Sequence, residues 1–281
     1  MRRIFFGILI CCLASGLAET PPAGDPASPD VPEAAPDPAI TEAAAPEAAP
    51  DLTSALFCTV AADDVAGVAR LLDAGADANA LLPDPAPDDL LRRFDGTNME
   101  FFVSKERGLT PLMLASAMGY TDVVRLLIER GANRHAVTLP HKTFALWLAG
   151  RAGHVEAMQA LLQVTPESDA GRQVIRINLA DQTAYLWKDG AIIRTMPISS
   201  GRAKYPTQRG RFVVTDKHKQ WKSTLYPARM PYFLRLSCRD FGLHAGSLPG
   251  YPASHGCIRL PAGDAKALFA SVPVGTLVEI E

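Results

Sequence analysis

A cysteine and a histidine thirteen residues apart are the side chains of this sequence best suited to covalent chemistry. Cys257 stands in the run Ser-His-Gly-Cys-Ile-Arg at residues 254–259, and His244 precedes it. A thiol attacks a carbonyl as its thiolate, and a nearby imidazole is the usual group that removes the proton near neutral pH. The pattern therefore predicts a nucleophile, Cys257, with His244 as its base.

The neighbours of the cysteine predict how such a site is supported. Glycine at 256 would let the backbone amides of Gly256 and Cys257, together with that of His255, approach a developing oxyanion. Ser254 and His255 either hold the loop through local hydrogen bonds or touch the substrate. Arg259 either clamps a carboxylate or forms an internal ion pair. The alternative for the whole segment is a turn that holds a half-buried thiol.

A zinc site is an alternative, because Cys257, His255, His244, Cys238 and His218 include the ligand types that zinc prefers. Their spacings match no common zinc pattern. The sequence therefore predicts neither a metal nor a cofactor.

Residues 172–281 resemble the catalytic domain of the L,D-transpeptidases, which are the cysteine enzymes of bacterial cell-wall cross-linking. The resemblance rests on His-Ala-Gly at 244–246, on Ser-His-Gly-Cys-Ile-Arg at 254–259 and on Pro-Thr-Gln-Arg-Gly-Arg-Phe at 206–212. Gln208 stands where the family pattern has a second proline. This departure bears on the substrate subclass rather than on the nucleophile.

The resemblance implies acyl transfer through a thioester on peptidoglycan stem peptides. Cys257 would attack the carbonyl on the L side of an L,D peptide bond, and His244, oriented by a backbone carbonyl near Ala245, would move the proton. Tyr232 would line the cleft, with simple packing as its alternative. Two other functions stay open: a hydrolase on the same domain, and a non-catalytic scaffold.

The N-terminus predicts export. Residues 1–18 combine two arginines, an apolar run and small residues, as in a secretory signal peptide, so membrane contact would be transient. Residues 19–51 hold nine of the 23 prolines and eight acids without a base, which predicts a disordered linker. We expect a periplasmic or cell-envelope location. Of the three cysteines that remain, Cys58 and Cys238 would form either a disulfide or two buried thiols.

The charge of the C-terminal part predicts an anionic partner. From residue 172 to the end there are sixteen Lys or Arg against seven Asp or Glu, a net charge of +9. Carboxylate-rich cell-wall peptides fit this excess. Nucleic acid does not, because no basic helix or aromatic stacking motif accompanies the charge.

Residues 52–165 predict a helical solenoid. Gly-Leu-Thr-Pro-Leu-Met-Leu-Ala at 108–115 resembles the opening of an ankyrin repeat, and related positions recur 34 residues later. An earlier copy lies around residues 68–77, separated by an insertion near 81–107, and the third copy has Phe144-Ala145 in place of Thr110-Pro111. Such repeats would either bind a protein partner or pack against the catalytic domain.

From residue 174 the apolar period changes to two, which predicts a mainly β domain, a mixed sandwich or barrel. Lys-Asp-Gly at 188–190 predicts a hairpin between strands at 183–187 and 191–196. Further strands are expected at 211–215, 233–236 and 276–280, with a short helix over 265–270 capped by Asp264. The predicted fold class is a helical ankyrin-repeat solenoid followed by this catalytic domain.

Overall fold

A computed structural model describes residues 51–223 and 228–281 of the chain. The predicted signal peptide and, apart from Asp51, the predicted linker lie outside the described residues. None of the described helices has the length and apolar character needed to cross a bilayer.

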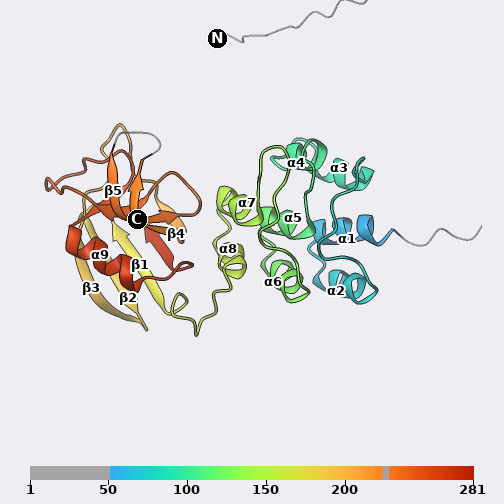
Figure 1. Ribbon diagram of the computed structural model, residues 1–281, viewed down its shortest axis with the longest axis horizontal. Coiled ribbons are helices and arrows are strands. Elements are labelled where there is room, and N and C mark those ends of the chain that lie inside the picture. The colour runs from blue at the N-terminus through green and yellow to red at the C-terminus, as the bar shows by residue number, and fades with distance from the viewer. Residues whose placement is uncertain (1–50, 224–227) are drawn as a thin grey trace, which may run out of the picture. The chain divides into compact units, whose positions relative to one another are not determined.

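Residues 52–161 form helices, most of them in antiparallel pairs (Figure 1). Three pairs, α1 with α2, α5 with α6 and α7 with α8, follow one another along the chain, and the insertion expected near residues 81–107 carries α3 and α4. The bounds are α1 Leu52–Ala61, α2 Val65–Asp73, α3 Asp88–Phe94, α4 Glu100–Ser104, α5 Pro111–Met118, α6 Thr121–Glu129, α7 Ala145–Ala152 and α8 Val155–Leu161. The predicted helical repeat region is confirmed.

The repeat motif sets the ends of α5. The Thr110 hydroxyl accepts a hydrogen bond from the amide of Met113 at 3.2 Å, and Pro111 starts the helix without leaving an amide unpaired. Gly119 ends it in the left-handed conformation, at φ 76°. The degenerate third copy keeps the glycine stop at Gly153 but begins at Phe144, which offers no side-chain cap.

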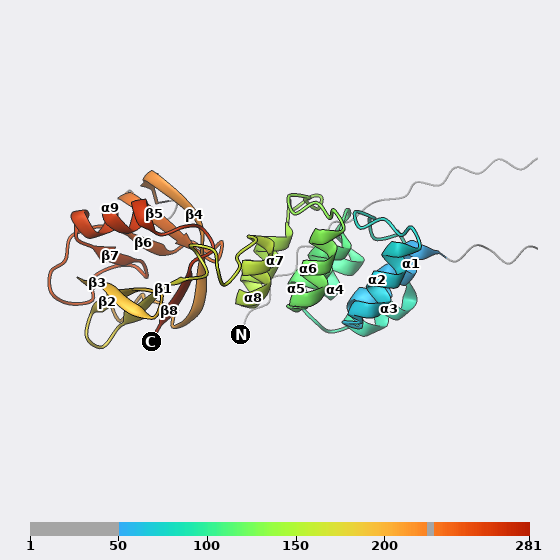
Figure 2. The ribbon, with the colours of Figure 1, turned by 90° about the horizontal axis from the view of Figure 1, so that it is seen from below.

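The C-terminal part is a mixed, eight-stranded sheet in the order β3-β2-β1-β8-β4-β5-β6-β7 (Figures 1 and 2). Strand pairs β1–β8 and β6–β7 are parallel, and the others are antiparallel. The bounds are β1 Gln173–Asn178, β2 Thr183–Lys188, β3 Ala191–Pro197, β4 Gly210–Lys222, β5 Arg229–Leu236, β6 Gly242–Ala245, β7 Ile258–Leu260 and β8 Leu277–Ile280. The predicted mainly β domain is confirmed.

The two ends of the sheet approach each other just beyond β3. Ser199 forms a bridge with Arg259 of β7, and their amides and carbonyls exchange two hydrogen bonds of 3.0 Å. The sheet therefore curls toward a barrel around a core that includes Ile175, Leu234 and Ile258, all fully buried. This closure brings the loops at the C-terminal motif together.

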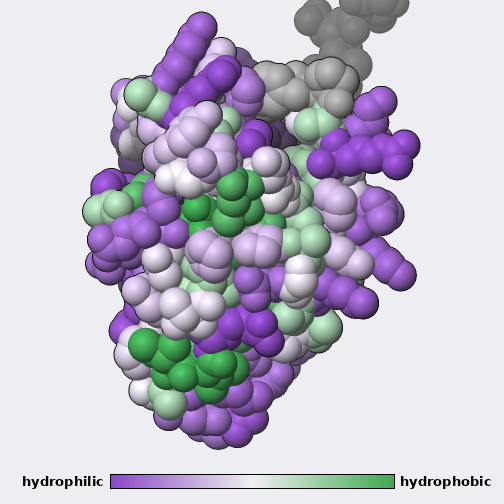
Figure 3. Space-filling model, turned by 90° about the vertical axis from the view of Figure 1, so that its left-hand side faces the viewer, coloured by the Kyte–Doolittle hydropathy of each residue, from purple (hydrophilic) through white to green (hydrophobic). Residues whose placement is uncertain are grey.

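Strand β3 keeps an exposed edge on the face seen in Figure 3, where apolar residues gather in two patches among polar ones. Ile192 and Ile193 are 48% and 55% exposed. The register between β2 and β3 shifts at Leu186 and Trp187, an irregularity of the kind that discourages edge-to-edge pairing.

Two local predictions were wrong. Helix α9 spans Ala262–Ser271 and starts after Pro261, so Asp264 lies inside its first turn and accepts a bond from Arg194 at 3.0 Å instead of capping. Strand β4 extends seven residues past the expected end at Thr215 because β5 pairs with its second half.

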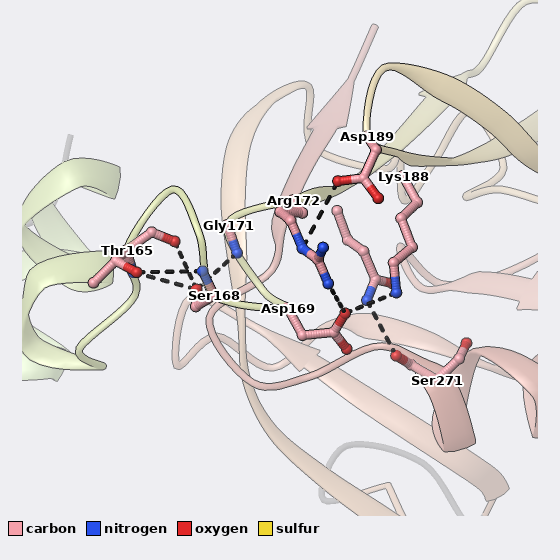
Figure 4. Close-up of polar contacts among 9 residues, drawn as sticks. Thr165, Ser168, Asp169, Gly171, Arg172, Lys188, Asp189 and Ser271 are labelled. Carbon is pink, nitrogen blue, oxygen red and sulfur yellow. Dashed lines mark hydrogen bonds and ion pairs between the residues drawn. The ribbon is translucent and has the colours of Figure 1, made fainter.

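Helix α8 is joined to β1 by a connector that is hydrogen-bonded to itself and to the sheet (Figure 4). The Ser168 hydroxyl donates to the carbonyl of Thr165 and accepts from the amide of Gly171. Asp169 accepts from Lys188 of β2 at 2.8 Å. The connector is therefore a fixed turn rather than a flexible linker.

Helical and sheet residues share one packed boundary within a single compact unit. Val213 of β4 is fully buried in the apolar core of the helical region. Gln159 of α8 donates to the carbonyl of Gly275 at 3.2 Å, and Arg211 pairs with Glu156 at 2.7 Å. The last repeat therefore packs against the β domain.

Candidate active site

His244 comes from the centre of the short strand β6, between β5 and β7. Its side chain is buried, with 7% exposure, and Nδ1 lies 2.8 Å from the carbonyl oxygen of Ala245. A carbonyl can only accept, so Nδ1 carries the proton and donates it to Ala245. The other ring nitrogen, Nε2, keeps its lone pair and can accept a proton.

Cys257 stands at the end of a tight loop that Ser254 holds. The Ser254 hydroxyl accepts from the amide of Gly256 at 3.1 Å and donates to the carbonyl of Cys257 at 2.5 Å. Gly256 adopts φ 109°, a conformation that side chains disfavour. The Gly256 amide, expected at the oxyanion position, is thus engaged by Ser254.

The two reactive side chains line one pocket of about 220 Å³. Burial raises the pKa of the Cys257 thiol above its ordinary value, although the amide of Gly242 opposes the shift. Burial lowers the pKa of His244, against the opposing bond to Ala245. Both shifts favour a thiol and a neutral imidazole, whereas the sequence suggested a thiolate.

Arg259 sits opposite His244 in the parallel register of β6 and β7, and it lines the same pocket. Gly246 makes room for it, since a Cβ there would come within 2.9 Å of the arginine side chain. Within residues 51–223 and 228–281, no ion pair involves Arg259. Of the two roles predicted for Arg259, the internal ion pair is absent from this part of the chain.

His255 lies on the exposed rim of the pocket. Its ring packs on Tyr205 with centroids 4.7 Å apart, and Arg202 donates to its Nε2 at 2.6 Å. Desolvation and the positive charge of Arg202 lower the pKa of His255, so the ring stays neutral. Arg202, with Lys204 and Arg259 nearby, makes this rim cationic.

The remaining predicted side chain, Tyr232, is not among the residues that line this pocket. Its ring packs against Phe269 of α9 at 5.7 Å. Sequence reasoning missed Met230 and Asp240, which do line the pocket. Asp240 lies in the turn that leads into β6, four residues before His244. Its position just before the histidine motif is the one sequence feature that could have indicated it as a pocket residue.

Cys58 and Cys238 are both free thiols, so of the two predicted alternatives the disulfide is wrong. Burial raises the pKa of Cys238 to about 11. Across the described part of the chain, no group of three or more His, Cys, Asp or Glu side chains is arranged to hold a metal ion.

Comparison with known proteins agrees with the geometry. Residues 172–280 match the L,D-transpeptidase catalytic domain (YkuD) family, and residues 40–174 match ankyrin repeats in three copies. The chain therefore carries the catalytic domain of an L,D-transpeptidase, an enzyme, behind ankyrin repeats.

Individual relatives match part of the chain. A Bacillus licheniformis protein, YkuD, which bears the name of an L,D-transpeptidase, is 29% identical over 144 residues, covering 43% of this chain and 85% of that protein. L,D-transpeptidase 1 of Mycobacterium tuberculosis is 24% identical over 200 residues, covering 60% of this chain and 78% of the relative. A solved L,D-transpeptidase structure from Mycobacterium tuberculosis is 27% identical with a TM-score of 0.37, and the match covers 39% of this chain and 57% of that one.

Proposed function

We propose that the chain is an exported cysteine acyltransferase that acts on peptidoglycan stem peptides through a Cys257 thioester. The observation that carries this proposal is that Cys257 and His244 line one pocket, with the imidazole tautomer fixed by the Ala245 carbonyl. The predicted signal peptide at residues 1–18 supports a periplasmic or cell-envelope location.

In the first half-reaction, His244 Nε2 takes the proton of the Cys257 thiol as Sγ attacks the carbonyl on the L side of an L,D peptide bond. The Gly256 amide is engaged by Ser254, so the oxyanion would be bound by the amide of Cys257, together with that of His255. The C–N bond breaks, the protonated Nε2 gives its proton to the departing D-alanine amine, and a thioester remains.

In the second half-reaction, an amine from another stem attacks the thioester. It loses a proton to Nε2 of His244, a new amide bond forms, and the released thiolate regains that proton. Water in place of the amine would give hydrolysis. Because the resting pair is neutral, His244 must act as a true general base in each attack rather than as a preformed imidazolium.

Arg259 is our candidate for holding a stem carboxylate. It lines the pocket beside both reacting side chains, and no carboxylate of the described residues pairs with it. A guanidinium that faces a carboxylate forms two parallel hydrogen bonds, which fixes the orientation as well as the position of the substrate.

The test is incubation of the purified chain with tetrapeptide muropeptides and a labelled D-amino acid. We expect release of D-alanine with incorporation of the label, and loss of both in Cys257→Ala and His244→Ala. Release without incorporation would replace the transferase by a hydrolase. No release, together with no acyl or carbapenem adduct on Cys257 by intact mass, would leave only the scaffold.

A further inference from the structure

A second, larger pocket lies on the helical repeats, in a region that the catalytic proposal does not use. It measures about 800 Å³ and lies between α4, the loop at residues 141–144 and α7. We name it the aromatic groove, defined by Phe101, Phe102, His141, Phe144 and Trp147.

Four of the five rings of the groove form a connected cluster. Phe101 meets Phe102 edge to face at 5.5 Å and His141 at 5.4 Å, and Phe102 meets Trp147 at 6.5 Å. Phe101 is nevertheless 45% exposed. Exposed, clustered aromatic surface in a concave site is typical of ligand binding rather than of packing alone.

Buried polar contacts hold the groove in shape. Glu106 is 6% exposed and hydrogen-bonds through its carboxylate to His141 Nδ1. The backbone of Thr143 is tied to the Thr138 hydroxyl at 3.1 Å. The first contact ties the 141–144 loop to the segment that follows α4, and the second ties it to Thr138 just before the loop, so the rings face a preformed space.

The rim of the groove is cationic. Lys105, Lys142 and Arg151 line it against one carboxylate, Glu100, which accepts a bond from the amide of Gly96. None of the three cations belongs to an ion pair in the part of the chain that the structure covers. Arg151 instead stacks on the Trp147 ring at 5.3 Å.

The groove continues toward the catalytic pocket. Trp147 and Arg151 also line an intermediate pocket of about 500 Å³, whose lining includes Asp240 and His255. These last two residues line the catalytic pocket as well. A chain of shared residues therefore links the aromatic groove to the pocket that contains Cys257.

The boundary along this path is closely packed. Arg239 Nη2 donates to the carbonyls of Gly150 and Arg151, each at 3.4 Å. A Cβ at Gly150 would come within 2.7 Å of the carbonyl oxygen of Ser237, so glycine permits the close approach of α7 to the β5–β6 turn.

We propose that the aromatic groove binds the polymeric cell-wall strand whose stem peptides the catalytic pocket processes, an inference that rests on the proposed function. Sugar rings present C–H groups that suit the negative faces of the aromatic rings, and stem carboxylates suit Lys105, Lys142 and Arg151. The ankyrin repeats would then hold the substrate itself rather than a protein partner.

The experiment measures binding of the full chain to isolated, insoluble peptidoglycan by co-sedimentation, in a Cys257→Ala background that prevents turnover. Phe101→Ala combined with Lys142→Ala should lower the affinity at least roughly tenfold. Val137→Ala combined with Arg125→Ala removes an equally exposed apolar side chain and one positive charge outside the groove, and it should bind normally. Lys142→Arg, which keeps the charge, should also bind normally, and thermal melting checks that each variant is folded.

The outcomes separate this inference from the proposed function. Unchanged sedimentation of the folded groove variant overturns the groove, as does capture of a protein by the groove while peptidoglycan binding is unaffected. Activity of the Cys257-containing chain on soluble tetrapeptides is measured in parallel. If that activity is absent while sedimentation still depends on Phe101 and Lys142, the acyltransferase proposal fails and the groove stands.

Discussion

The protonation state of the resting site gives the sharpest prediction. Burial raises the pKa of Cys257 and lowers that of His244, so we expect a neutral thiol and a neutral imidazole near pH 7. A thiol of ordinary pKa, about 8.5, is about 3% thiolate at pH 7, and a raised pKa puts Cys257 below that fraction.

Alkylation by iodoacetamide measures this fraction, because only the thiolate reacts. The rate at Cys257 should rise about tenfold for each pH unit from 6 to 8 and reach no plateau below about pH 8.5. Peptide mass analysis separates Cys257 from Cys58 and Cys238, and Cys257→Ala supplies the background. The profile of His244→Gln should be nearly parallel, because the imidazole is not holding a preformed ion pair.

Turnover should show a different profile. Turnover needs neutral His244, and the pKa of His244 is lowered by burial. The decrease of kcat/KM toward acid pH should therefore have its midpoint below pH 6.5, the ordinary histidine value. Activity would be present above that midpoint and lost as pH falls through the folded pKa of His244. A different alkylation profile would refute the neutral pair. If the alkylation rate of Cys257 reached a plateau below pH 7, and if that plateau were lost in His244→Gln, the site would be a thiolate–imidazolium pair.

Four substitutions test individual contacts. Ser254→Ala removes both hydrogen bonds that hold the cysteine loop and should lower the free energy of unfolding by about 1–3 kcal/mol in denaturant titrations, with a larger loss of turnover than of substrate binding. Arg259→Lys should raise KM for tetrapeptides at least roughly tenfold, the equivalent of one charge-assisted hydrogen bond, and an unchanged KM would argue against the carboxylate clamp. Gly119→Ala places a Cβ in the left-handed conformation and within 2.5 Å of the His154 ring, so it should cost about 2 kcal/mol by thermal melting. Thr110→Ala removes a helix cap and should cost about 1 kcal/mol, whereas Thr110→Ser should cost little.

Local chemistry explains which parts of the fold were predictable. The Thr110-Pro111 start and the Gly119 stop of α5 are set by capping within a few residues, so the sequence contains all the information. The hairpin at residues 183–196 likewise follows from Asp189 and Gly190, both of which adopt positive φ. The start of α9 was missed because Asp264 looked like a cap, although its actual partner is the distant Arg194.

The pocket was less predictable than the motif. The sequence placed Cys257 and His244 close together, and the parallel register of β6 and β7 accounts for that proximity. Met230 and Asp240 enter the pocket only because β5 pairs with β6, a contact between strands that no local pattern encodes. The protonation states also depend on burial, which a motif does not reveal.

The irregular third repeat has a structural explanation. An end repeat normally carries a polar outer face, but α7 and α8 face the catalytic domain instead of solvent. At Gly150, a side chain would collide with the carbonyl of Ser237, and Glu156 of α8 pairs with Arg211 of β4. Gly150 and Glu156 thus serve the boundary between the solenoid and the catalytic domain, whereas Phe144, which replaces Thr110, lines the aromatic groove. A third repeat that is packed in this way against the catalytic domain does not move independently of it. Such a repeat is suited to extend the substrate-binding surface from the catalytic pocket to the aromatic groove.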